Sequence, residues 1–166
     1  MPINAIKILR SKKRKRTVTA RIVKEILVVR APENISESRL QKVIGELKSR
    51  IERKRLKEEL NKDEKLAQRA KGFNLQYFGD KLKINSIEYV TGQNSKFGCC
   101  NYRTGCIRIS HRISTMPEWV RDYVIIHELA HLVVPNHSKA FWDIVNCYKL
   151  SERARGFLIA RGSEEE

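Results

Sequence analysis

The chain of 166 residues, with 41% hydrophobic and 32% charged residues, is long enough to bury a core of its own. Its apolar start at residues 3–9 is short and precedes the basic cluster instead of following it, which is not the order of a secretory signal. No apolar run approaches the roughly 20 residues of a membrane span. We therefore expect one domain over residues 1–166, in a soluble cytoplasmic protein with no membrane partner.

The net charge of +15 is concentrated in the N-terminal part of the chain. Residues 1–72 hold 22 Lys and Arg against 9 Asp and Glu, a net charge of +13, whereas residues 73–166 hold 12 against 10, a net charge of +2. A basic region of this kind attracts nucleic acid, nucleotides or acidic surfaces. The alternative is a solvated helix face beside a basic hairpin, and the sequence leaves both interpretations open.

The N-terminal part predicts two strands followed by a long helix. Alternating residues at 17–23 and an apolar run at 25–30 are expected to pair as an antiparallel hairpin, with a tight turn near Lys24. Ser36 is the expected N-cap of the helix. Beyond Ile51 charged residues dominate, and we expect the helix either to project from the domain or to fray before Gly72. The apolar positions of this helix recur with helical period: Leu40, Val43, Ile44, Leu47 and Ile51.

From residue 73 the hydrophobic period falls towards two. This change predicts strands at residues 74–78, 81–90, 95–100 and 106–110. A strongly apolar helix is expected to begin near Pro117, and further helices are expected from Ser138 and over residues 152–160.

The strongly apolar helix carries the sequence His127-Glu128-x-x-His131. Residues four apart lie on one face of a helix, so the two imidazoles can share one ion. In the H-E-x-x-H arrangement two histidines hold zinc, and the glutamate acts as general base on a metal-bound water. We therefore expect His127 and His131 as metal ligands and Glu128 as the catalytic residue. The competing interpretation is a pair of core histidines with no metal.

His137 is the expected third ligand. Catalytic zinc takes three protein ligands and keeps one position open. Pro135 biases the residue before it away from helical geometry, so the chain can turn back after His131 and bring His137 to the same ion. One zinc ion (Zn²⁺) per chain is therefore expected.

Residues 123–142, residues 96–99 (KFGC) and residues 28–32 (VVRAP) resemble the YgjP-like metallopeptidases, a family related to the WLM and SprT-like groups. The resemblance extends over about residues 10–161. Phe97 stands where that family usually has a tryptophan.

The resemblance implies a zincin-like fold with zinc bound by His127, His131 and His137 and with Glu128 as catalytic acid and base. It also implies that the strand at 106–110 is the exposed edge beside the metal, where an extended peptide could add. The expected fold class is therefore α+β, in which an N-terminal antiparallel hairpin, a long helix and a small antiparallel or mixed sheet accompany the active-site helix. The basic hairpin and long helix would occupy about residues 1–72, and the catalytic part about residues 73–161.

Three functions are compatible with these features. The first is a zinc metallopeptidase that cleaves polypeptides through a water activated by Glu128. The second is a metal-dependent nucleotide (triphosphate) hydrolase, for which Arg103, Arg108 and Arg112 are the candidate phosphate-binding groups. The third is a nucleic-acid-binding module with a structural zinc, for which Cys147 is the plausible fourth ligand.

Two further sets of residues are candidates for lesser roles. An oxyanion donor is expected, and the candidates are Tyr148, His111, Tyr102 and a backbone amide. Cys99 or Cys100 could face Cys106 across a hairpin to form a second, thiolate metal site, although free thiols are the simpler expectation.

Overall fold

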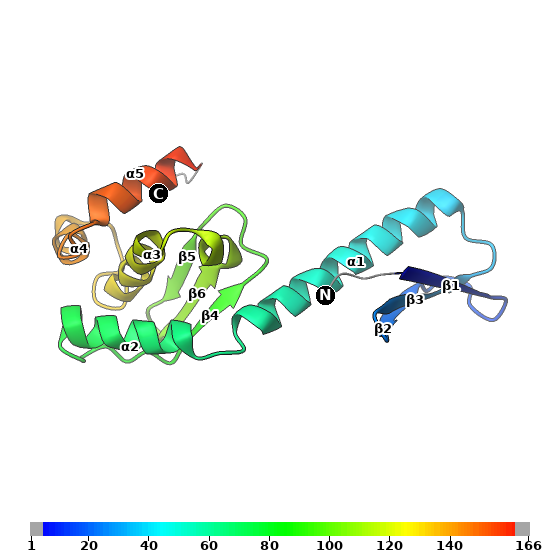
Figure 1. Cartoon of the computed structure of the whole chain (residues 1–166), viewed down its shortest axis with the longest axis horizontal. Coiled ribbons are helices and arrows are strands. Elements are labelled where there is room, and N and C mark those ends of the chain that lie inside the picture. Colours follow the sequence, from blue (N-terminus) through cyan, green and yellow to red (C-terminus); the bar gives the residue numbers. More distant parts are fainter. Residues whose placement is uncertain (1–4, 162–166) are drawn as a thin grey trace. The chain divides into compact units, whose positions relative to one another are not determined.

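The structure is a computed structural model that describes residues 5–161. Between Arg55 and Leu56 it divides into two compact units, each with a hydrophobic core, and each unit is described by itself. The fold class is α+β, as predicted, with helices and two small mixed sheets among the described residues (Figure 1). That residues 1–166 act as a single domain stays a prediction.

The first unit contains a three-stranded sheet. The central strand is β3 (Ile26–Pro32), which pairs in parallel with β1 (Ala5–Ser11) and antiparallel with β2 (Thr19–Val23). Lys24 and Glu25 join β2 to β3 with positive φ values of 48° and 64°. The sequence does not predict β1, because its apolar side chains are exposed and do not alternate between a buried and a solvated face.

The core of this unit forms between β3 and helix α1 (Glu37–Leu60). The alternation of β3 places every second side chain on one face, and the helical period of α1 presents its own apolar face to that side. The buried residues of this core are Leu27, Val29, Ala31, Leu40 and Ile44.

The second unit is built on a sheet of order β4-β6-β5, and its elements are α2 (Lys65–Phe78), β4 (Ser86–Val90), β5 (Gly98–Asn101), β6 (Cys106–Ser110), η1 (His111–Thr115), α3 (Glu118–Ala130), α4 (Lys139–Val145) and α5 (Ser151–Ala160). The strand β6 is parallel to β4 and antiparallel to β5. Helix α3 contacts the sheet as well as α2, α4 and α5, and most of its residues are buried (Figure 1). The apolar helix predicted from the sequence is therefore the centre of this core.

Three predictions about this unit are wrong. Residues 74–78, predicted as a strand, end α2, and the strand predicted over residues 81–90 begins only at Ser86. The helix is favoured because Asn74 lies on its buried face and its side chain exchanges hydrogen bonds of 3.1 Å with the backbone of Leu82. The long helix ends before Gly72: α1 ends at Leu60, and a short turn precedes α2.

The third error concerns the sheet edge. The predicted edge strand at residues 106–110 is β6, which lies in the middle of its sheet, whereas β5 is an edge strand. The sequence pattern of a short strand does not specify its neighbours, so strand order had to come from the tertiary structure.

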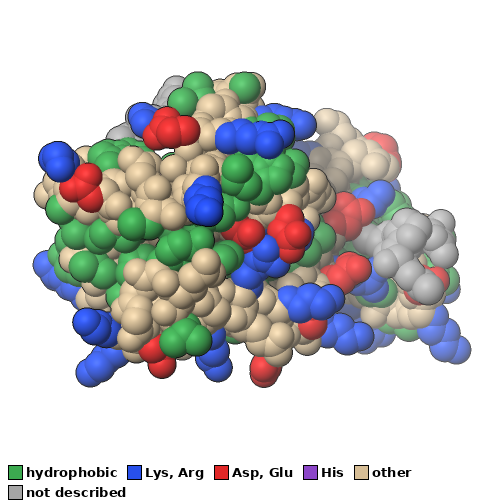
Figure 2. Space-filling model, turned by 60° about the vertical axis from the view of Figure 1, so that its left-hand side comes forward, with side chains coloured by type: hydrophobic (Ala, Val, Ile, Leu, Met, Phe, Trp, Pro, Cys, Tyr) green, Lys and Arg blue, Asp and Glu red, His purple; other side chains and the backbone are tan. Residues whose placement is uncertain are grey.

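The distribution of charge on the surface and the hydropathy of the helices bear on possible partners. On the face drawn in Figure 2, Lys and Arg side chains lie among apolar and acidic side chains and do not gather into a patch of one charge. Within residues 5–161, no helix is both long enough and apolar enough to cross a membrane.

Candidate metal centre

The last turn of α3 brings two histidines onto one face. The backbone N–H of His131 donates to the carbonyl of His127 at 3.3 Å, so the two residues are one helical turn apart. Their ring centroids are separated by 5.0 Å. The helix thus produces the pairing that the sequence spacing predicts.

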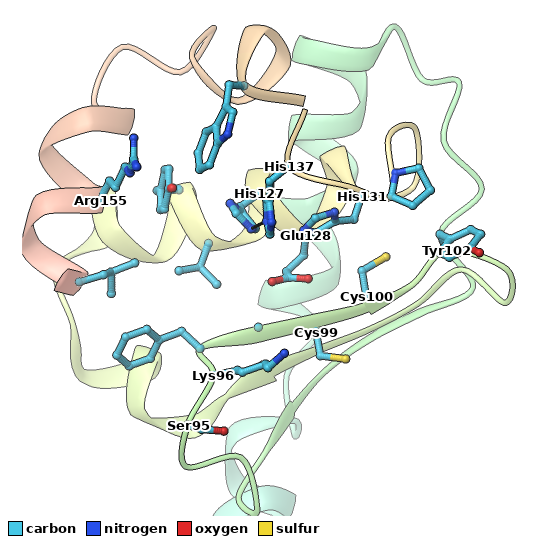
Figure 3. Close-up of a pocket in the computed structure, with 17 residues that line it drawn as sticks. Ser95, Lys96, Cys99, Cys100, Tyr102, His127, Glu128, His131, His137 and Arg155 are labelled. Atoms are coloured by element: carbon cyan, nitrogen blue, oxygen red, sulfur yellow. Dashed lines mark hydrogen bonds between the residues drawn. The ribbon is translucent and has the colours of Figure 1, made fainter. Parts of the chain in front are cut away.

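The chain turns back after the helix ends and places His137 beside His127 and His131. The segment from Leu132 to Val134 forms a tight turn bonded back to Leu129 and Ala130, and Pro135 follows. The His137 ring centroid lies 5.1 Å from that of His127 and 4.8 Å from that of His131. Figure 3 shows the three rings at one end of α3 above a common cleft.

The three imidazoles are spaced to hold one metal ion. One nitrogen from each lies within 4.8 Å of the other two, and the Nε2 atoms of His127 and His137 are 3.2 Å apart. Bonds of about 2.0–2.1 Å to a tetrahedral zinc would separate two ligand nitrogens by about 3.3 Å, which is close to the separation of the His127 and His137 nitrogens. The assignment of these residues as ligands stays a prediction.

The surroundings of His127 and His131 favour neutral rings. Burial, followed by the neighbouring histidines, lowers the pKa of His127 to about 3, and burial also lowers the pKa of His131. His131 stacks on Phe141 at 4.4 Å, and its Nδ1 lies 3.3 Å from the carbonyl oxygen of Val134, which leaves Nε2 directed elsewhere. A neutral imidazole held through its other nitrogen is the form that binds metal.

Glu128 is buried between the helix and the sheet. Only 5% of it is exposed, and burial raises the pKa of its carboxyl group to about 8, while the nearby Lys96 acts in the opposite direction. Its Oε2 atom has no hydrogen-bond partner among the described residues. A buried carboxyl group with an unsatisfied oxygen is costly in a fold and is typical of a functional site.

A cleft of about 330 Å³ opens beside these four residues. Its sheet side carries Lys96, Cys100 and Tyr102, and Arg155 lies on its helical side (Figure 3). Trp142 of α4 also lines it. The volume is that of a small-ligand site, which fits one segment of a larger substrate.

The candidate oxyanion donors lie in different parts of the second unit, and not all of them line the cleft. Tyr102 lines the cleft, whereas Tyr148 donates a hydrogen bond of 3.2 Å to the carbonyl of Trp119 and does not line it. His111 lines a different cavity, together with Arg112 and Phe157. Of the three side chains proposed from the sequence, only Tyr102 lies at the cleft.

The cationic groups of the cleft differ from those proposed. Arg103, Arg108 and Arg112 do not line it, and Arg112 instead packs 4.1 Å from the ring centroid of Phe97. Lys96 and Arg155 line it in their place. No sequence pattern singles out Arg155, because its position depends on how α5 packs against the rest of the unit.

The cysteines form no second metal site in the described part of the chain. All four are free thiols, and no metal-type cluster of three or more ligands besides the three histidines occurs among residues 5–161. Cys147 is exposed and donates to the carbonyl of Asp143 at 3.4 Å. The structure therefore does not bring Cys147 into the histidine cluster as a fourth ligand.

An H-E-x-x-H helix packed on a small sheet, with a third histidine folded back beside it, is an arrangement typical of metal-dependent hydrolases. Residues 81–150 match the family model of the YgjP-like metallopeptidase domain, which confirms the resemblance over this part of the chain. This match supports a metal-dependent peptidase.

The chain was also compared with solved structures and with curated proteins. The crystal structure of the metallopeptidase zymogen of Pyrococcus abyssi abylysin is similar to this chain with a TM-score of 0.48 and 22% identity, over 55% of this chain and 86% of that chain. A search of curated proteins found no match.

Proposed function

We propose that this protein is a zinc metallopeptidase in which His127, His131 and His137 hold one metal ion and Glu128 transfers the proton. The observation that carries the proposal is that three imidazole nitrogens lie within 4.8 Å of one another at the mouth of a cleft. When bound there, zinc would polarise a substrate carbonyl and lower the pKa of a water towards about 7.

Glu128 is the proposed general base and acid. It lines the same cleft as the histidines and is one residue from His127, so it faces the ion's position without being needed as a ligand. It would accept a proton from the attacking water and deliver it to the leaving amine nitrogen of the cleaved peptide bond. Both transfers use the same carboxyl group and leave it unchanged at the end of the cycle.

The edge strand β5 is the proposed binding site for the substrate backbone. It pairs with β6 on one side only, and its residues Gly98, Cys99 and Cys100 line the cleft. An extended peptide can add to such an edge through main-chain hydrogen bonds, which require no particular side chains. This feature favours a polypeptide substrate.

A metal-dependent nucleotide hydrolase is the second candidate. Lys96 and Arg155 both line the cleft, and cationic groups beside a metal could hold phosphates. The two candidates make opposite predictions for the same assay.

The test presents the zinc-loaded protein with an unfolded polypeptide and, in parallel, with nucleoside triphosphates. The Glu128→Gln variant is the control for contaminating activity. We expect cleavage of the polypeptide that depends on Glu128, and no release of phosphate. Glu128-dependent release of phosphate with an intact polypeptide would establish the nucleotide hydrolase instead.

We also propose that the basic N-terminal part binds polyanions. Residues 1–72 carry a net charge of +13, and Lys12, Lys13, Lys15 and Arg16 are exposed. Binding through such charges weakens steeply as salt is added. Fluorescence anisotropy with labelled DNA and RNA oligonucleotides should show weakly sequence-specific, salt-sensitive binding. An absence of binding at low ionic strength would contradict the proposal and favour a solvated basic surface with no nucleic-acid partner.

A further inference from the structure

Helix α4 places an aromatic residue against all three proposed ligands. The ring centroid of Phe141 lies 4.8, 4.4 and 4.8 Å from those of His127, His131 and His137, respectively. The planes of Phe141 and His131 differ by only 27°, so these two rings stack, whereas the other two imidazoles meet Phe141 edge-to-face. Each of these distances is within the range of aromatic contact. One phenyl ring thus packs on the whole histidine cluster.

Phe141 lies behind the histidines as seen from the cleft. The three histidines line the cleft (Figure 3), whereas Phe141 is fully buried and does not line it. A phenyl ring offers no ligand atom, and rings in contact at these distances leave no space for a water between them. The side of the histidine cluster away from the cleft is therefore closed by an apolar ring.

Hydrogen bonds orient only one of the three imidazoles within residues 5–161. A histidine that binds metal usually has its other ring nitrogen bonded to a carbonyl or carboxylate, which fixes the orientation of the ring. The carbonyl of Val134 provides this partner for His131. The Nδ1 atom of His127 is buried and has no hydrogen-bond partner among the described residues, where the only such contact of His137 is with His127 itself. The orientation of these two rings therefore depends on packing.

Trp142, the next residue of α4, packs on His137. The two rings stack with a centroid distance of 5.6 Å and an interplanar angle of 24°, and Trp142 also lines the cleft. His137 is exposed and lies between α3 and α4, so regular secondary structure does not fix its position. Contact with a flat indole restricts the rotation of its ring.

We infer that Phe141 and Trp142 are positioning residues for the metal centre: together they hold the imidazoles in place, and Phe141 confines the open coordination position to the cleft. This inference rests on the ligand set of the proposed function. Catalytic zinc needs three protein ligands and one open position, whereas manganese favours six ligands. A closed rear side therefore favours an ion of low coordination number.

The test measures metal binding to the full-length protein and needs no substrate. Competition with a chromogenic chelator gives the Kd for zinc. The visible spectrum of the cobalt(II)-loaded protein reports the coordination number, because four-coordinate cobalt absorbs much more strongly than six-coordinate cobalt. Phe141→Leu keeps an apolar side chain but removes the flat ring. We expect the Kd for zinc to rise about 10- to 100-fold, as for other changes beside metal ligands, and the cobalt absorption to fall as water reaches the rear side.

Two further variants separate positioning from a general loss of stability. Trp142→Leu should raise the Kd for zinc but leave cobalt four-coordinate, because Phe141 still closes the rear side. Trp142 is only partly buried, so this variant tests the positioning role even where Phe141→Leu does not fold. Phe157→Leu is the control and should change neither quantity, since Phe157 packs on Trp119 at 5.5 Å and on no histidine within the described part of the chain.

Failure of this inference is distinguishable from failure of the proposed function. Parent-like zinc affinity and cobalt spectra in the Phe141 and Trp142 variants would overturn the inference and leave the ligand set intact. An equal loss of affinity in Phe157→Leu would also overturn it. A parent protein that binds no zinc would overturn both proposals. Zinc binding that depends on Phe141 supports the inference even when no peptide is cleaved.

Discussion

The side chain of Glu128 packs directly against the backbone of Gly98 in the edge strand β5. A Cβ atom at position 98 would lie 2.5 Å from the Cδ atom of Glu128 and 2.6 Å from its Cγ atom, well inside van der Waals contact. The proposed general base therefore occupies space that only glycine leaves open. Helix α3 and the edge strand β5 are in direct contact at this point.

Gly98→Ala should displace the Glu128 carboxyl group and lower kcat/KM by about 100-fold, since a misplacement of about 1 Å can have that effect. Bound zinc should be unchanged, because the three atoms nearest to an added Cβ all belong to Glu128 and not to a proposed ligand. Peptide cleavage and metal content measured on the same sample check both parts. Gly92→Ala, where an added Cβ meets no atom within 4 Å, is the matched control. Full activity in the Gly98→Ala protein would show that Glu128 does not need its present position.

His131→Ala should lose most of the bound zinc, because it removes one of three proposed ligands. Metal content after dialysis, measured by inductively coupled plasma mass spectrometry, gives the result directly. His111→Asn is the control, since His111 lies at another cavity. Full zinc retention in the His131→Ala protein would contradict the proposed ligand set.

Cys100 should be the slowest cysteine to alkylate. Burial raises the pKa of its thiol to about 12, with Glu128 acting in the same direction. At pH 8 only about one thiol in ten thousand would be ionised, and the thiolate is the reactive form. Iodoacetamide labelling followed by tandem mass spectrometry should show faster modification at the exposed Cys99 than at the half-buried Cys100, and equal rates for the two neighbours would contradict this prediction.

The ion pair between α2 and α3 should stabilise the second unit. Arg69 binds both carboxylate oxygens of Asp122, one of them at 2.8 Å, and Asp122 is 9% exposed. Asp122→Ala should lower the free energy of unfolding by about 2 kcal/mol, less than for a fully buried pair because Arg69 remains partly solvated. Glu118→Ala removes the exposed partner of Arg69 and should cost less than about 1 kcal/mol. Equal effects in denaturant titrations would contradict this ranking.

The candidate site was predictable because its geometry is local. His127 and His131 are related by one helical turn, and the return of His137 needs only a helix end before Pro135. The α+β class was expected from the predicted strands and helices together with the resemblance to the YgjP-like metallopeptidases, although the strand predicted at residues 74–78 is part of α2.

The remaining features depend on long-range packing. Residues 74–78 are helical because the side chain of Asn74 forms hydrogen bonds with the backbone of Leu82. No local sequence pattern indicates this contact. The edge position of β5 is a property of strand order. Arg155 reaches the cleft only through the packing of α5, so the sequence pointed to other arginines.

The most direct test of this account is the mass-spectrometric detection of new peptide termini in an unfolded protein substrate. The substrate is incubated with the metal-free protein, the zinc-reconstituted protein and the zinc-reconstituted Glu128→Gln variant. We predict new termini only with the reconstituted parent, while the variant retains its zinc and fold because the amide preserves shape without accepting a proton. Termini that appear at the same rate without metal, or with Glu128→Gln, would contradict the proposed roles of the histidines or of Glu128.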